Sequence, residues 1–155
     1  MRMNVSIGHI EKLRKHGFSF PHYENEIRNG IVEKGMVFWY DCEEWIEGGQ
    51  VFSDQLSLRD VVIKNGVWLP SLEYLLLWLK YNSFSYQLIY TEGRFSVIAE
   101  DIILSELYEG ANQGTIIDAL VKVIKRICQS KKRAYVPVLP KGYKPVGEDG
   151  MYTDN

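Results

Sequence analysis

The chain has 155 residues and a mass of 18.0 kDa, with 46% hydrophobic and 25% charged residues, which is the composition of a single globular domain. An aromatic content of 13% and the lack of low-complexity repeats exclude an intrinsically disordered chain. The net charge of −2 is unevenly distributed: residues 24–60 contain nine acidic and three basic side chains, whereas residues 122–144 contain eight basic ones and no acidic one. The basic end predicts either a surface for an acidic partner such as nucleic acid, or cations that offset a helix dipole.

The sequence also bears on the cellular compartment. The longest strongly apolar stretch, Leu69–Leu79, is about half the length that a membrane-spanning helix needs, and it contains Glu73. The first residues lack the uninterrupted apolar run of a secretory signal. Cys42 and Cys128 form no CxxC or Cys/His spacing, so we expect reduced, buried structural thiols. These features predict a cytoplasmic protein without membrane contact.

The first predicted element is a short amphipathic helix over Ile7–Lys15. Ser6 is expected to be its N-cap and Gly17 to end it, because a serine before the apolar periodicity and a glycine after it are typical helix boundaries. Residues 18–30 contain Pro21 and several turn-forming residues. We therefore expect a loop or a short extended segment there.

The next residues indicate β-structure. Residues 36–40 form an aromatic, β-prone run that predicts a strand, and residues 41–49 are expected to be a loop or one helical turn. Asn65-Gly66 is the dipeptide most typical of a two-residue hairpin. Because it separates the short apolar runs 61–63 and 67–69, it predicts a tight turn there.

A second helix is predicted over the leucine-rich segment that follows. Ser71 is its expected N-cap, Glu73 stands in its first turn and Asn82 is expected to end it. Four leucines repeat at helical spacing and define the face that we expect to be buried. These are Leu72, Leu75, Leu76 and Leu79.

A hairpin and a third strand are predicted next. Residues 84–90 and 95–99 are rich in aromatic and β-branched residues and are expected to pair across a turn at Glu92-Gly93. Residues 102–108 predict a third strand. Together these segments predict a small antiparallel sheet.

The last predicted helix begins at Thr115, whose Thr-x-x-acid pattern is that of a capping box, and continues to about Gln129. The predicted fold is therefore α+β, with a small antiparallel sheet packed against two or three helices. We expect residues 1–131 to form one domain. Residues 132–155 are basic and rich in proline and glycine, so they are expected to be an extended or disordered tail.

Residues 56–128 resemble a known group of proteins. The resemblance rests on four features: the run Trp68–Leu72 before a helix, the hairpin at Glu92-Gly93, a turn at Glu109-Gly110 and the capped helix at Thr115. In this order they resemble small proteins of bacteriophages and mobile elements that have an α-β-α sandwich fold. The resemblance covers about half the chain and brings no catalytic residue, so it implies an origin rather than a mechanism.

Motifs of enzyme chemistry are lacking. The sequence contains no GxxxxGK[ST], GxGxxG, HExxH or GxSxG pattern. Its three histidines, His9, His16 and His22, lie near the N-terminus, but a seven-residue helical step separates His9 from His16 by about 10 Å, which is too far for ligands of one metal ion. We therefore expect no metal and no cofactor.

One acidic and aromatic segment is a candidate site. Its tryptophan and tyrosine side chains offer contact area at low entropic cost, and the acids around them would select a basic protein partner. The candidate binding residues are Trp39, Tyr40, Asp41, Glu43, Glu44 and Trp45. Alternatively, the carboxylates from Asp41 to Glu47 would act as general acid and base in a small hydrolase.

A basic segment is the other candidate. Lys131, Lys132 and Arg133 precede Tyr135, and this combination is used by binders of single-stranded nucleic acid for phosphate contacts and base stacking. The sequence therefore leaves three functions open. The first is a non-enzymatic protein that binds another protein, the second is a nucleic-acid-binding protein, and the third is a small hydrolase.

Overall fold

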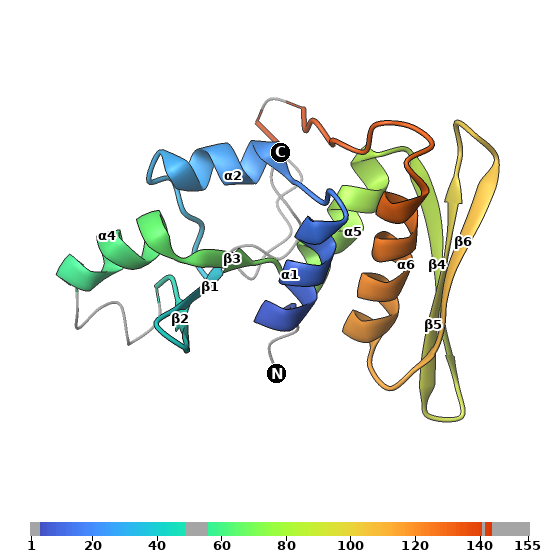
Figure 1. Cartoon of the computed structure of the whole chain (residues 1–155), viewed down its shortest axis with the longest axis horizontal. Helices are drawn as coiled ribbons and strands as arrows, with labels where there is room; N and C mark the ends of the chain where they lie inside the picture. Colours follow the sequence, from blue (N-terminus) through green and yellow to red (C-terminus); the bar gives the residue numbers. More distant parts are fainter. Residues whose placement is uncertain (1–3, 49–55, 141, 144–155) are drawn as a thin grey trace.

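The computed structural model describes residues 4–48, 56–140 and 142–143. Within these ranges the chain forms five helices and six strands, and the strands make two three-stranded antiparallel sheets (Figure 1). The predicted α+β class is confirmed, although the sequence indicated one sheet rather than two. No helix in the described ranges is both long enough and apolar enough to span a membrane.

The first helix, α1, covers Ile7–Lys15 as predicted. Ser6 is its N-cap: the Ser6 hydroxyl accepts a hydrogen bond from the His9 amide at 3.1 Å, and the His9 ring accepts one from the Ser6 amide at 3.5 Å. This reciprocal pair satisfies two amides that a helix start leaves without partners. Ile10 and Leu13 are fully buried and attach α1 to the core.

The second helix, α2, covers Pro21–Arg28, so the prediction of a loop over residues 18–30 is wrong. Pro21 stands in the first turn, where a residue without an N–H group costs no hydrogen bond. The Glu24 carboxylate then accepts the Phe20 amide at 2.9 Å. Proline therefore starts this helix rather than breaking one.

The first sheet has the order β2-β1-β3, with β1 at Val37–Tyr40, β2 at Glu43–Ile46 and β3 at Val67–Leu69. β1 and β2 join through Asp41-Cys42, whose φ angles of 52° and 61° are those of a two-residue hairpin turn. The loop or helical turn predicted for residues 41–49 is therefore a strand in its central part.

Asn65-Gly66, the dipeptide most typical of hairpins, does not join two strands here. Residues before it form the helix α4, Leu56–Asn65, and β3 pairs with β1 instead of with a preceding strand. Gly66 passes so close to the Val62 and Trp39 carbonyl oxygens that a Cβ atom would collide with them. Glycine is thus required here by close packing at a helix end.

The helix α5, Leu72–Tyr81, confirms the second predicted helix and its end at Asn82. Leu75, Trp78 and Leu79 are fully buried. The Trp78 indole donates a hydrogen bond to the Ser19 carbonyl at 3.0 Å, which ties α5 to the segment between α1 and α2. α5 therefore lies at the centre of the molecule (Figure 1).

The second sheet has the order β4-β5-β6, with β4 at Phe84–Thr91, β5 at Arg94–Asp101 and β6 at Glu106–Gln113. The turn predicted at Glu92-Gly93 is confirmed by its positive φ angles of 53° and 78°. The third strand exists, but it begins later than predicted, because residues 102–105 form the turn between β5 and β6.

The helix α6, Ile116–Ser130, covers one face of the second sheet over β5 and β6 and lies between that sheet and α1 (Figure 1). Thr115 is its N-cap and accepts the Asp118 amide at 3.0 Å, as predicted. Gly110 lies within β6 and not in a turn. A Cβ at Gly110 would collide with the Ala119 carbonyl, so this glycine allows α6 to approach the sheet closely.

The segment after α6 packs onto the domain. Tyr135 and Leu139 are 7% and 6% exposed and belong to the core cluster, whereas Val136 and Val138 point outward. The domain therefore continues past the boundary predicted at residue 131. The rest of the predicted tail, residue 141 and residues 144–155, lies outside the described residues.

Candidate interaction site

The turn between β5 and β6 is organised by a buried carboxylate. Asp101 ends β5 and is 0% exposed. Its Oδ1 atom accepts the amides of Ile103 at 3.0 Å and Leu104 at 3.1 Å, and its carbonyl accepts the Ser105 amide at 2.8 Å. The Ile102 amide donates to the Ser83 carbonyl at 3.0 Å. All four amides of the turn therefore have fixed partners.

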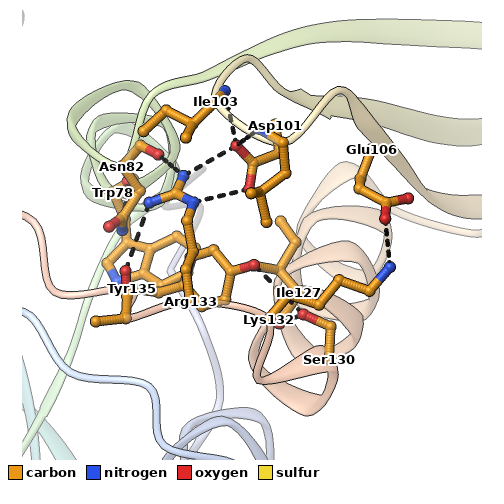
Figure 2. Close-up of polar contacts among 12 residues, drawn as sticks. Trp78, Asn82, Asp101, Ile103, Glu106, Ile127, Ser130, Lys132, Arg133 and Tyr135 are labelled. Carbon is orange, nitrogen blue, oxygen red and sulfur yellow. Dashed lines mark hydrogen bonds and ion pairs between the residues drawn. The ribbon is translucent and has the colours of Figure 1, made fainter.

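Arg133, from the segment after α6, neutralises this carboxylate (Figure 2). Its Nε lies 2.8 Å from Asp101 Oδ2 and its Nη2 lies 3.2 Å from Asp101 Oδ1, which is a two-pronged ion pair. Arg133 also donates to the Asn82 carbonyl at the end of α5. The rings of Phe84 and Tyr135 lie 5.5 Å and 4.7 Å from the guanidinium carbon. Arg133 thus joins α5, the β5–β6 turn and the C-terminal segment.

The pair is ionised at neutral pH. Burial alone would raise the pKa of Asp101, but the hydrogen bonds from Arg133 and from the Leu104 and Ile103 amides outweigh it and hold that pKa below its ordinary value. A carboxylate with this many donors keeps its charge and its position. The turn above it is therefore rigidly attached to the domain.

The same turn exposes apolar side chains. Ile102, Ile103 and Leu104 are 60%, 61% and 38% exposed, and Leu107 at the start of β6 is 69% exposed. We call these four residues the apolar turn. Tight turns usually consist of glycine, proline, asparagine, aspartate or serine, so three consecutive large apolar residues are unusual there.

A second exposed apolar feature lies on β4. Tyr86, Leu88 and Tyr90 point to the same face of the sheet as α6, yet they are 41%, 40% and 65% exposed, because α6 packs over β5 and β6. We call these three residues the β4 strip. Seven of the eleven exposed large apolar side chains in the described ranges belong to the apolar turn and the β4 strip. Exposed apolar area is therefore concentrated on the second sheet.

The acidic and aromatic segment forms the β1–β2 hairpin. Asp41, Glu43 and Glu44 are exposed, and Trp39 and Tyr40 are partly buried. Its sixth predicted member is different, since only 5% of Trp45 is exposed. The Trp45 indole donates to the Tyr40 carbonyl at 3.1 Å. Trp45 is a core residue that supports the hairpin from beneath.

The carboxylates of this hairpin diverge. Glu43 and Glu44 are neighbours on a strand, so their side chains point to opposite faces. Both oxygens of Glu47 accept hydrogen bonds from Arg59, at 2.8 Å and 2.6 Å. Across the described residues, no three His, Cys, Asp or Glu side chains gather as metal ligands.

The two cysteines differ in exposure. Cys42, expected to be buried, is exposed at the hairpin turn, whereas Cys128 is buried as expected.

The basic segment is largely used within the fold. Besides the ion pair of Arg133, Lys132 Nζ lies 2.5 Å from Glu106 Oε1 on β6, and Tyr135 is in the core (Figure 2). Lys131 is exposed and ends α6 with a left-handed backbone, at φ 50°. Of the four residues predicted for nucleic acid, Arg133 and Tyr135 thus support the domain.

A cleft of about 320 Å³ lies between α1, α2, α4 and β3. Its lining carries charges of both signs, among them Arg14, Glu24, Arg28 and Lys64. Arg14 Nη2 lies 3.3 Å from Glu24 Oε2, and Arg28 donates to Asn25 Oδ1 at 2.7 Å. Arg14, Glu24 and Arg28 are thus bonded to neighbours on α1 and α2.

Comparison of the chain with models of protein families, with curated proteins and with solved structures finds no match.

The apolar turn was not predicted from the sequence. Residues 102–108 were predicted as a strand, because Gly110 and Gly114 would break a longer helix. The only signal for a turn was the Asp101 side chain before that run, since aspartate often hydrogen-bonds amides two or three residues ahead.

Proposed function

We propose that this protein acts by binding another protein, and that the apolar turn is its contact surface. One observation carries the proposal: Ile102, Ile103 and Leu104 are exposed together on a turn whose amides are all hydrogen-bonded. Exposed apolar groups on a soluble domain typically mark interaction sites. A turn that is already ordered loses little conformational entropy on binding, so more of its contact energy becomes affinity.

The charges around the turn favour a protein over the other partners. Lys132 forms an ion pair with Glu106, the residue that directly follows the turn, so the charges of these two side chains offset each other there. Nucleic acid and anionic membranes are bound through unpaired cations. An apolar centre with a balanced polar rim is the usual arrangement of a protein interface.

Site-specific photo-crosslinking tests the proposal. A benzoylphenylalanine at position 103 of the full chain is irradiated in a lysate of the source organism, and the crosslinked protein is identified and then purified. The matched control carries the same group at Val61, an exposed apolar residue on α4 that is 37% exposed. We expect the purified partner to bind the wild-type chain directly and to crosslink from position 103 but not from position 61.

Two further probes decide between partner classes. Vesicles of phosphatidylcholine and phosphatidylglycerol, and a labelled single-stranded oligonucleotide, are each titrated with the protein. Strong vesicle binding that Ile103→Ser abolishes would replace the protein partner by a membrane. Oligonucleotide binding that weakens with salt and with Lys131→Ser would restore the nucleic-acid function. Crosslinks from Glu43 but not from position 103 would move the site to the acidic hairpin, and each of these results would overturn the proposal.

A further inference from the structure

β4 is an edge strand of unusual regularity. It pairs with β5 over its full eight residues, from Phe84 opposite Asp101 to Thr91 opposite Arg94, without a register shift. In the described part of the chain, no strand pairs with its other side. The backbone groups along that side therefore have no strand partner in the described residues and can pair with another strand.

The opposite edge of the sheet is protected, whereas β4 is not. β6 carries Glu106, Glu109 and Gly110, and its pairing with β5 shifts register between Phe95 and Val97. Charges and bulges are among the devices by which proteins prevent edge strands from pairing. The sequence of β4, FSYQLIYT, contains no charged residue, no proline and no glycine.

The β4 strip adds side-chain contacts to this open edge. Tyr86, Leu88 and Tyr90 lie on one face, and the Tyr90 ring packs against Phe95 with ring centroids 4.9 Å apart. A strand added beside β4 would place its own side chains next to this strip. It would thereby bury the apolar area that α6 leaves uncovered.

We propose that β4 pairs antiparallel with β4 of a second copy of this chain, about a twofold axis at Leu88, which joins the two sheets into one of six strands. In this register Tyr86 faces Tyr90 of the second copy and Gln87 faces its Ile89. Leu88 faces itself. A twofold axis at Gln87 would instead place Phe84 in the interface. Phe84 is only 4% exposed, because it already packs in the core of its own chain.

The occupant is a second copy because β4 is complementary to itself. A twofold axis places identical strands side by side, and a charged strand would then bring like charges together. β4 has none, and its apolar residues meet apolar residues across the axis. One strand and its neighbours bury less than the roughly 800 Å² per partner of a standard interface, so the dimer should be weak, in roughly the micromolar range.

Sedimentation velocity of the full chain across low to high micromolar concentrations tests this dimer. The wild type should shift from monomer to dimer. Leu88→Lys and Leu88→Glu should each raise the dimer dissociation constant on the order of 100-fold, because like charges then face each other at the axis. An equal mixture of the two variants should dimerise again, since lysine then faces glutamate.

The matched control is Ile31→Lys, an exposed apolar residue outside the second sheet that is 56% exposed, and it should dimerise as the wild type does. Circular dichroism checks that each variant is folded. Tyr90→Lys, at the most exposed position of the strip, carries the test if the Leu88 variants unfold. A wild type that stays monomeric, a Leu88→Lys variant that dimerises normally, or a mixture that stays monomeric would each overturn the proposal. The turn is assayed separately by crosslinking from position 103, so either proposal can fail alone.

Discussion

In the β2-β1-β3 sheet both faces carry buried side chains, whereas the β4-β5-β6 sheet is covered by α6 on one face and open on the other. Phe38, Trp45 and Trp68 pack on one face of the first sheet, and Val37 and Leu69 pack on the other. In the second sheet, Val97 and Ala99 are buried beneath α6, but the opposite face carries exposed Gln87, Glu100 and Leu107.

The difference separates stability from recognition. A sheet covered on both faces contributes mainly to the core, and changing it should unfold the protein. A sheet with one open face can present contacts without loss of the fold, provided that its turns are held in place. The Asp101–Arg133 pair is the element that does this for the apolar turn.

The largest expected effect is on the first sheet. Trp45→Ala should lower the free energy of unfolding by about 3–5 kcal/mol, because it removes a buried indole and leaves a cavity. The control on the open sheet is Leu107→Ala, which is 69% exposed and should change stability little. Urea denaturation of both variants measures the comparison. If the two variants unfold at the same urea concentration, the first sheet does not contribute more to the core than the second, and the comparison is wrong.

Breaking the buried ion pair should have an effect of similar size. Arg133→Met leaves the Asp101 carboxylate buried without its cation, which should cost about 3–5 kcal/mol in unfolding free energy. Lys132→Met breaks the exposed pair with Glu106 and should leave stability nearly unchanged. If thermal denaturation shows the same loss for both variants, Arg133 does not have the structural role assigned to it.

A smaller effect is expected from pH. The folded-state pKa of Asp101 lies below its ordinary value of 3.8, so its contribution to stability is complete above that value and is lost as the pH falls through the folded-state pKa. In Arg133→Met burial should instead raise the pKa of Asp101, and protonation then relieves the buried charge. The gap in unfolding free energy between wild type and variant should therefore begin to narrow above about pH 4, as Asp101 of the variant takes up a proton, and should narrow further at lower pH, as the wild type loses its ion pair. A gap that stays constant between about pH 7 and about pH 3 would contradict this.

The smallest effect concerns the two thiols. Cys42 is exposed on the hairpin of the first sheet, whereas Cys128 is a buried residue of α6, and this burial raises the pKa of its thiol to about 12. In the native protein at neutral pH, a thiol reagent such as dithionitrobenzoate should modify Cys42 quickly and Cys128 only after unfolding. Cys42→Ser should remove the fast reaction. Simultaneous reaction of both thiols would show that the core around Cys128 opens without global unfolding.

The elements that sequence predicted well have local signals. The helices α1, α5 and α6 begin at a serine or threonine, and the β4–β5 hairpin has a glycine in its turn. The elements that were missed depend on distant partners. α2 begins with a proline that looked like a breaker, and the short β2 is a strand because it pairs with β1.

The candidate site could not be predicted from the sequence, because it too depends on residues that are distant along the chain. Arg133 and Asp101 are 32 positions apart, and nothing in either neighbourhood indicates the other. Arg133 and Tyr135 therefore resembled a basic, aromatic tail rather than part of the core. The buried and exposed alternation of residues 135–139 is regular in the structure, but two prolines and a glycine concealed it.

The central claim is that the apolar turn is rigid in the free protein, and amide hydrogen exchange tests it most directly. The Ile103 and Leu104 amides donate to the buried Asp101 carboxylate, so they should exchange much more slowly than amides of an open loop. In Arg133→Met this protection should fall sharply, while in Lys132→Met it should remain. Exchange of both amides at open-loop rates in the wild type would show that the turn is mobile and would contradict the account.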